Sequence, residues 1–150
     1  MIQPLAGMMA PSFLIRVITL ALIKQDTCIF VSKCDDVVKQ DCFYRALGGG
    51  VEFGETSQEA LQREFWEELG AELTNIQYLC CLENLFTYNG KPGHELVQVY
   101  QCDFVDRRFY QSESFTACEG SNEFIAFWEE GERFKSGELR LVPEGFLQFL

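Results

Sequence analysis

The sequence predicts a single α/β domain, because its length, its apolar content and its order of strand-like and helix-like segments agree. The chain has 150 residues, a common size for one domain and too short for two ordinary ones. Hydrophobic residues make up 47% and aromatic residues 14%, which is enough to build one buried core. No repeat, low-complexity tract or linker marks a boundary. We therefore expect one domain over residues 1–150, with residues 1–12 as an N-terminal tail.

The chain before the first glycine cluster is expected to form strands. Residues rich in β-branched and aromatic side chains occupy three segments, 13–24, 27–33 and 42–46. The apolar run from Phe13 to Ile23 is too short to cross a bilayer, contains Arg16 and follows no basic residue. We interpret it as a buried strand, not as a secretion signal or a membrane span.

A helix is predicted over residues 56–69, because apolar side chains recur there at every fourth position. The stripe consists of Leu61, Phe65 and Leu69. Both ends carry a capping signal: Thr56 and Glu59 fit the capping box at the start, and Gly70 fits a left-handed cap at the end.

The second half of the chain is expected to contain a hairpin, one more strand and a last helix. Two strand-like segments, 75–88 and 95–105, flank a Gly/Pro turn at 89–94. A strand is predicted at 123–128, and a helix is predicted to begin near Pro143, since proline suits the first helical position.

Charge and cysteine content narrow the classes of function. The net charge of −11 disfavours binding to nucleic-acid backbones. Seven cysteines, an odd number with no CxxC spacing, indicate neither a complete disulfide framework nor a zinc site. We expect a cytoplasmic protein without membrane partners, in which most cysteines fill the core.

The predicted helix carries an unusual group of carboxylates. Glu64, Glu67 and Glu68 stand at i, i+3 and i+4 and share one face, which we expect to point away from the apolar stripe. Like charges at this spacing destabilise a helix unless something compensates them. A divalent cation such as Mg²⁺, which prefers oxygen ligands, would do so. A solvated acidic face is the plainer alternative.

Three consecutive glycines, Gly48 to Gly50, precede this helix. Glycine lets the backbone approach a ligand closely, so we expect a tight loop that offers a carbonyl to a metal or amides to an anion. Taken alone, a triple glycine is more often just a turn.

Together these residues resemble the signature of the Nudix hydrolase family, G-x5-E-x7-R-E-x-x-E-E-x-G. The match runs from Gly49 to Ala71 and consists of Gly49, Glu55, Arg63, Glu64, Glu67, Glu68 and Gly70. Ala71 stands where the family prefers a bulky aliphatic residue. The resemblance implies the Nudix fold, an α/β/α sandwich around a mixed β-sheet, over about residues 13–150.

The resemblance also implies an enzyme, a pyrophosphohydrolase that needs Mg²⁺ or Mn²⁺. It would cleave a diphosphate bond in a nucleoside diphosphate linked to another group. By motif match, Glu64, Glu67 and Glu68 would bind the metal, with the Gly48 carbonyl as a further ligand. Arg63 would pair with Glu55 or Glu67 and hold the ligand carboxylates in place. The general base stays open between Glu64, our first choice, and the later Glu119 and Glu123, for which a solvated loop is the favoured interpretation.

Substrate residues are less sharply indicated. Arg45 could pair with a phosphate or cap a strand end. His94, the sole histidine, could touch substrate, although a hydrogen-bonding role beside the turn is the favoured interpretation. In the family, a tyrosine about seventeen residues beyond the signature goes with dinucleoside polyphosphate hydrolases. Tyr88 lies 88 − 71 = 17 residues beyond Ala71, which tilts the substrate prediction that way.

Other substrates and other functions stay open. ADP-ribose, nucleotide sugars and nucleoside triphosphates are the alternative substrates, and RNA cap removal is disfavoured by the acidic charge. A nucleotide-binding sensor with this fold and an acidic interaction protein are the alternatives without turnover. A homodimer is compatible with the sequence but is not indicated by it.

Overall fold

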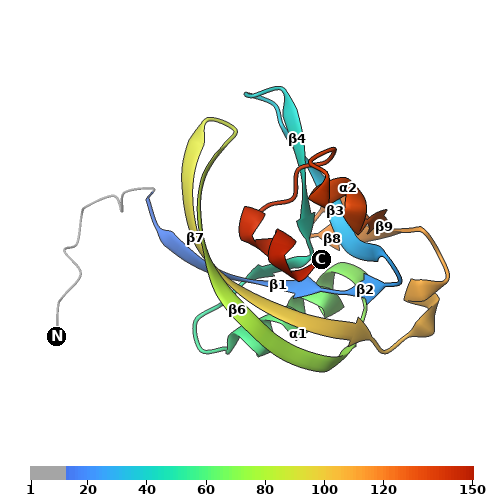
Figure 1. Cartoon of the computed structure of the whole chain (residues 1–150). Coiled ribbons are helices and arrows are strands. Elements are labelled where there is room, and N and C mark those ends of the chain that lie inside the picture. The colour runs from blue at the N-terminus through green and yellow to red at the C-terminus, as the bar shows by residue number, and fades with distance from the viewer. Residues whose placement is uncertain (1–12) are drawn as a thin grey trace.

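The computed structural model describes residues 13–150, which form mainly β-strands with few helices (Figure 1). The strands are β1 (Ile15–Leu22), β2 (Lys24–Gln25), β3 (Cys28–Asp36), β4 (Asp41–Ala46), β5 (Gly48–Gly50), β6 (Leu73–Tyr88), β7 (Lys91–Phe104), β8 (Ser114–Glu119) and β9 (Asn122–Glu130). The helices are α1 (Ser57–Leu69) and α2 (Gly131–Lys135), with 3-10 helices η1 (Arg107–Tyr110) and η2 (Glu144–Phe149).

The strands form two sheets. The first has the order β5-β1-β7-β6 and is mixed, because β1 pairs parallel with β7 and antiparallel with β5. The second has the order β2-β3-β9-β8, with β4 added to β3. The mixed α/β architecture predicted from the sequence is confirmed.

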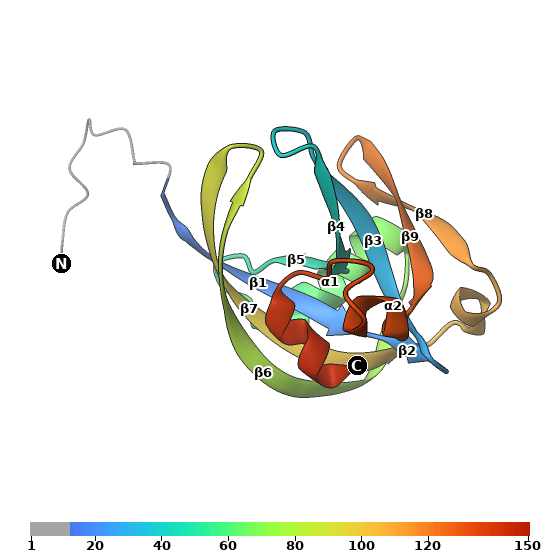
Figure 2. The same cartoon turned by 45° about the horizontal axis from the view of Figure 1, so that its top comes forward.

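Strand β1 separates two halves of the core, because alternate side chains of a strand face opposite sides. Ala21 and Ile23 face a cluster built around Leu61 and Phe65 of α1. Ile18, Leu20 and Leu22 face the second cluster, which includes Phe134 and Phe146 from the C-terminal helices. In Figure 2, α1 lies behind the first sheet and α2 and η2 lie in front of it. The sheet is thus covered by helices on both faces.

Most of the predicted elements are confirmed, with shifted ends. Helix α1 begins and ends where the capping signals indicated, and β1, β3, β4, β6, β7 and β9 overlap the predicted strands. The predicted turn at 89–94 is too long, because only Asn89 and Gly90 connect β6 to β7. Both have positive φ, of 49° and 77°, which suits a two-residue hairpin turn.

Other expectations were wrong or missed. The glycines form strand β5 and not a loop, since Gly48 to Gly50 pair with Leu20 to Ile18. The last helix is a 3-10 helix that starts at Glu144, just after Pro143. Strand β8 and helix α2 were not foreseen, and the predicted tail at residues 1–12 lies outside the described residues. No helix within residues 13–150 is both long enough and apolar enough to span a membrane.

The tips of two hairpins, β3–β4 and β6–β7, lie side by side (Figure 2), and the buried carboxylate of Asp36 joins them. Asp36 is 2% exposed, and it accepts hydrogen bonds from the backbone N–H groups of Val38, Lys39 and Asn89 at 3.0–3.2 Å. The Lys39 ammonium also donates to the Thr87 carbonyl across the gap, at 2.6 Å. These contacts hold the two tips together over the space between them.

Candidate active site

Helix α1 is anchored at both ends, which fixes the direction of its acidic side chains. Thr56 Oγ1 accepts from the Glu59 N–H at 3.2 Å, and Glu59 Oε2 accepts from the Thr56 N–H at 2.7 Å. Gly70 ends the helix with φ 62°. Because α1 packs on β1, β5 and β8, its face beside the apolar stripe is covered. The prediction that the trio points away from the core is wrong for Glu68, which is 8% exposed, whereas Glu64 is half-buried and Glu67 is exposed.

Arg63 is the centre of an ion-pair network. Its guanidinium donates two hydrogen bonds to Glu55, at 2.7 and 3.0 Å, and one to the Gly50 carbonyl at 3.0 Å. Nη1 donates to Glu64 at 3.0 Å and to Glu67 at 3.2 Å. Pairing with Arg63 holds the pKa of Glu55 below its usual value. The structure thus places Arg63 against both partners named from the sequence, and against Glu64 as well.

The Glu64 carboxyl group lies directly over Gly49. A methyl group on Gly49 would overlap the carboxyl carbon and both oxygens of Glu64. Only glycine leaves room for this approach, so the signature glycine fixes where the Glu64 carboxylate sits. Burial raises the pKa of Glu64, and the charges of Glu67 and Glu119 add to this effect against the opposing influence of Arg63.

Glu68 has no such partner. Its Oε2 atom is buried and receives no hydrogen bond from the described residues. Burial raises the pKa of Glu68 to about 8, with Glu64 and Glu119 contributing and Arg45 opposing. A buried carboxylate oxygen without a donor is costly, so this arrangement is stable only with a proton or a cation at the site.

Strand β5 places backbone carbonyls beside these carboxylates. Gly49 is the register partner of Thr19 on β1. The residues two positions away, Leu47 and Val51, form backbone hydrogen bonds with β1, so every second residue of this segment bonds to β1. In antiparallel pairing the intervening residues direct their carbonyls outward. Gly48 and Gly50 therefore point theirs away from β1, and Arg63 takes that of Gly50.

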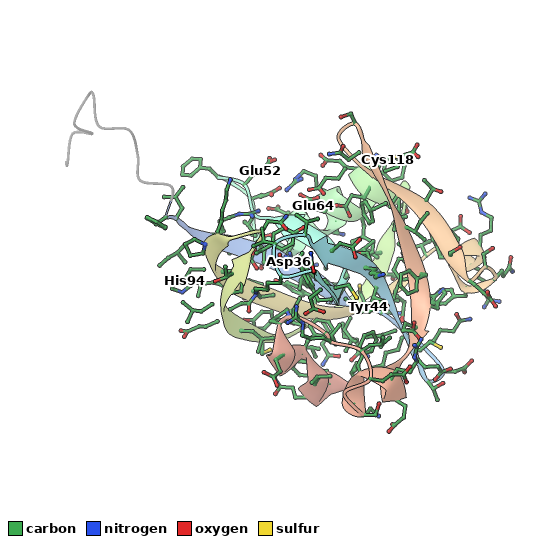
Figure 3. All side chains as sticks on the ribbon, turned by 90° about the horizontal axis from the view of Figure 1, so that it is seen from above. Asp36, Tyr44, Glu52, Glu64, His94 and Cys118 are labelled. Atoms are coloured by element: carbon green, nitrogen blue, oxygen red, sulfur yellow. The ribbon has the colours of Figure 1, made fainter. Side chains whose placement is uncertain are left out.

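The two later glutamates lie at the β8–β9 hairpin, not in a loop as predicted. Both are exposed, but they face opposite sides of their strands. Glu119 shares a face with the buried Ala117, and its charge raises the pKa values of Glu64 and Glu68. Glu123 pairs with Cys118 on the other face. In the view of Figure 3, Glu64 lies between Glu52 and the hairpin that carries Cys118.

A cavity of about 300 Å³ opens between the two joined hairpins. Arg45 and Tyr88 both line it. Arg45 Nη2 lies 3.9 Å from Glu95, and the positive charge of Arg45 opposes the rise in the pKa of Glu68. Tyr88 donates its hydroxyl to the Asp35 carbonyl at 3.2 Å and packs edge-on against Phe43.

His94 does not line this cavity. It lies on β7 opposite Ile15 and Leu85, on the face of the sheet away from that of its neighbour Glu95. Figure 3 shows it toward the edge of the molecule, apart from Glu64. The structure therefore keeps His94 apart from Arg45 and Glu64, although His94 and Tyr88 line a neighbouring pocket together.

The residues present fit a divalent cation, although they do not form a ready cluster. Within residues 13–150, no three His, Cys, Asp or Glu side chains converge on one point. Arg63 draws the carboxylates of Glu64 and Glu67 toward itself, which leaves Glu68 apart. The donor set is made only of oxygens, as Mg²⁺ and Mn²⁺ prefer, and the orphaned Glu68 oxygen needs a positive partner.

Sequence reasoning missed two acidic residues that the structure makes prominent, Asp36 and Glu95. Glu95 is 4% exposed and lines the cavity. A signal for Glu95 exists in the sequence, because it alternates with the buried Val97 and Val99 and so falls on the inward face of β7. Asp36 lies at a hairpin tip, and its burial depends on the second hairpin.

Comparison with known proteins identifies the family to which this fold belongs. The family model of the NUDIX domain matches residues 17–142. A MutT NUDIX hydrolase from Burkholderia pseudomallei is similar over 78% of this chain and 84% of its own, with 25% identity and a TM-score of 0.59. A mutator MutT protein from Bacillus halodurans shares the fold over 90% of this chain and 79% of its own, with 17% identity and a TM-score of 0.60.

A curated relative matches locally. The NAD-capped RNA hydrolase NudC of Chromobacterium violaceum is 51% identical over 35 residues, which is 23% of this chain and 13% of that protein. The family model, in contrast, covers most of the chain, including α1 and its glutamates. This chain therefore belongs to the Nudix hydrolase family.

Proposed function

We propose that the protein hydrolyses a diphosphate bond in a nucleoside diphosphate linked to another group, with Mg²⁺ or Mn²⁺ as cofactor. The observation that carries this is the buried Glu68 oxygen without a hydrogen-bond donor, beside the Glu64 carboxylate. Glu64, Glu67, Glu68 and the Gly48 carbonyl would hold the metal. When bound, the metal would screen the diphosphate and lower the pKa of the attacking water.

The chain's own residues would position the reacting groups. Arg63 keeps the Glu64 and Glu67 carboxylates at fixed positions, since it is itself held by the two hydrogen bonds that it donates to Glu55. Glu64 is our choice for the general base, which takes a proton from water as the oxygen attacks phosphorus and the anhydride bond breaks. Glu119 is the alternative that the geometry favours over Glu123, because it faces α1.

Arg45 would bind a phosphate of the substrate. Its guanidinium lines the cavity, and Arg45 lies near the end of β4, just before strand β5 on which α1 packs, so it could meet the phosphates of a nucleoside bound in the cavity. Tyr88 would form part of the nucleoside wall. The preference for dinucleoside polyphosphates stays a proposal, and the use of the Tyr88 hydroxyl by Asp35 weakens the argument from its spacing. The odd number of cysteines supports a reducing compartment, the cytoplasm.

The test is a substrate panel with Mg²⁺, with Mn²⁺ and with a chelator. The panel contains dinucleoside polyphosphates, ADP-ribose, NAD, nucleotide sugars and nucleoside triphosphates. At least one should be hydrolysed only with metal. Glu67→Gln and Glu68→Gln should each abolish that activity, whereas Glu72→Gln, at an exposed position, should not. Full activity in both site variants, or no metal-dependent turnover on any substrate, contradicts the proposal and favours a sensor.

A further inference from the structure

Glu95 is the most unusual group in the cavity between the β3–β4 and β6–β7 hairpins. Its side chain is 5% exposed and no described residue donates a hydrogen bond to it, but its oxygens, unlike Glu68 Oε2, are not fully enclosed and open toward the cavity. Arg16 Nη1 and Arg45 Nη2 each approach its oxygens only to 3.9 Å, too far for a hydrogen bond. A buried carboxylate gains much from donors and loses much without them. Glu95 therefore presents an unfilled pair of acceptors to whatever occupies the cavity.

The surroundings of Glu95 fit a flat ring. Asn84 is its cross-strand neighbour on β6, and both line the cavity. Phe86 pairs with Gly93, and its ring lies directly over that glycine, because a methyl group on Gly93 would overlap it. The absence of a side chain at Gly93 lets the aromatic ring lie close to the sheet beside Glu95. Phe43, held edge-on against Tyr88, lines the cavity from the other hairpin.

The charges set the direction in which a nucleotide would lie. Arg45 approaches Glu95 to 3.9 Å with one nitrogen, and it lies near the end of β4, just before strand β5 on which the signature helix α1 packs. A phosphate bound by Arg45 on the side of the acidic trio leaves the base at Glu95, Asn84 and the aromatic rings. The cavity volume of about 300 Å³ is at the lower end of the range for small-molecule sites.

We propose that Glu95 reads the base of the substrate and selects guanine. A carboxylate offers two acceptors side by side, and guanine presents two adjacent donors, the N1–H and the exocyclic amino group, on one edge. Adenine presents an acceptor at N1 beside its amino group, which the carboxylate repels, and hypoxanthine lacks the amino group. Buried groups left unpaired by the wrong ligand are the strongest source of such discrimination. This inference rests on the proposed function only in taking the ligand to be a nucleotide.

The first experiment measures binding of GMP, IMP and AMP to the unmodified protein without metal, by calorimetry. We expect GMP to bind about 10- to 100-fold more tightly than IMP or AMP, the effect of one hydrogen bond to a charged group. Equal affinities, or tighter binding of AMP, overturn the proposal. Because no turnover is needed, GMP-selective binding without hydrolysis of any guanine nucleotide would support this inference and contradict the proposed function.

The second experiment exchanges the acceptor pattern. In Glu95→Gln the carboxamide offers one acceptor and one donor, which match the amino group and N1 of adenine. The ratio of GMP to AMP affinity should fall at least tenfold, with AMP binding more tightly than in the unmodified protein. Glu83→Gln, at an exposed position on the other face of β6, should leave the ratio unchanged.

A purely supporting role for Glu95 gives a different result. If Glu95 only held Arg16 and Arg45 in place for the phosphates, Glu95→Gln would lower the binding affinities for GMP and AMP by the same factor, and the proposal would be wrong. The ratio of GMP affinity to AMP affinity does not depend on the fraction of folded protein, because both nucleotides are measured on the same sample. Should the variant not fold at all, the comparison of GMP with IMP and AMP on the unmodified protein decides the matter by itself.

Discussion

Two buried carboxylates, Asp36 at the hairpin tips and Glu68 on α1, have the same chemical group and opposite surroundings. Asp36 accepts three backbone hydrogen bonds, which hold its pKa below the usual value, with the Lys39 N–H contributing most. Glu68 leaves one buried oxygen without a donor, and burial raises its pKa to about 8. A carboxylate saturated by its own chain stabilises the fold, whereas an unsaturated one is available to a ligand.

Glu64 and Glu67 are intermediate between Asp36 and Glu68. Each accepts a hydrogen bond from Arg63, but the single positive charge of Arg63 does not neutralise all the carboxylates around it. One guanidinium serves three side chains, Glu55, Glu64 and Glu67. The negative charge that remains suits a divalent cation, and the Arg63 network keeps the oxygens in position for it. In the acidic cluster, Glu64 and Glu67 are thus positioned by Arg63, whereas Glu68 is left available to a metal ion.

Replacing Arg63 should cause a large loss of activity, although a smaller one than replacing Glu67 or Glu68. Arg63→Lys keeps the charge but cannot make the two-fold contact with Glu55 and also reach Gly50 and Glu67. We expect metal-dependent hydrolysis to fall about 10- to 100-fold, as for other residues that orient metal ligands. Steady-state kinetics on the best substrate of the panel measures this. Arg107→Lys, an exposed control, should change little. Unchanged kinetics in Arg63→Lys would show that the network does not position the ligands.

The same carboxylate-to-amide change should have opposite effects on stability at Asp36 and Glu68. Asp36→Asn places an amide nitrogen against an N–H donor, so the melting temperature should fall by about 5 °C. Glu68→Gln removes a buried charge without a partner, so the metal-free melting temperature should stay the same or rise. Thermal melts in a chelator at pH 8.5 test both, with Asp26→Asn as the exposed control. A large fall in the melting temperature of Glu68→Gln would mean that Glu68, like Asp36, stabilises the fold.

The dependence of stability on pH should distinguish the two groups, by a smaller amount. The pKa of Glu68 is raised in the folded protein, so its contribution is greatest at low pH and is lost as pH rises from about 5 to about 8. The pKa of Asp36 is lowered, so its contribution is present above the usual value near 4 and is lost below it.

Melts of the metal-free protein between pH 5 and pH 9 measure this difference. The gap in melting temperature between Glu68→Gln and the unmodified protein should widen as pH rises. A gap that is constant from pH 5 to pH 9 would mean that Glu68 titrates normally.

The local elements could be predicted because their signals lie within a few residues of each other. Capping at Thr56 and Gly70 set the limits of α1, and the apolar stripe of α1 required only its own period. Strand β8 was missed because its residues alternate weakly and its pairing partner, β9, follows a turn. The glycines were read as a loop because glycine has low strand propensity, and pairing with β1 overrode it.

By itself, the sequence determined the helix, its caps, the signature carboxylates and the pairing partners of Arg63, since all of these lie within about 20 residues of one another. Only the tertiary structure decided that Glu68 is buried without a donor, that Glu119 and not Glu123 faces α1, and that Arg45 and Glu95 share a cavity while His94 lies outside it. The physical reason is that burial and hydrogen-bond saturation depend on strands brought together from distant parts of the chain, and no local pattern encodes which donors they supply.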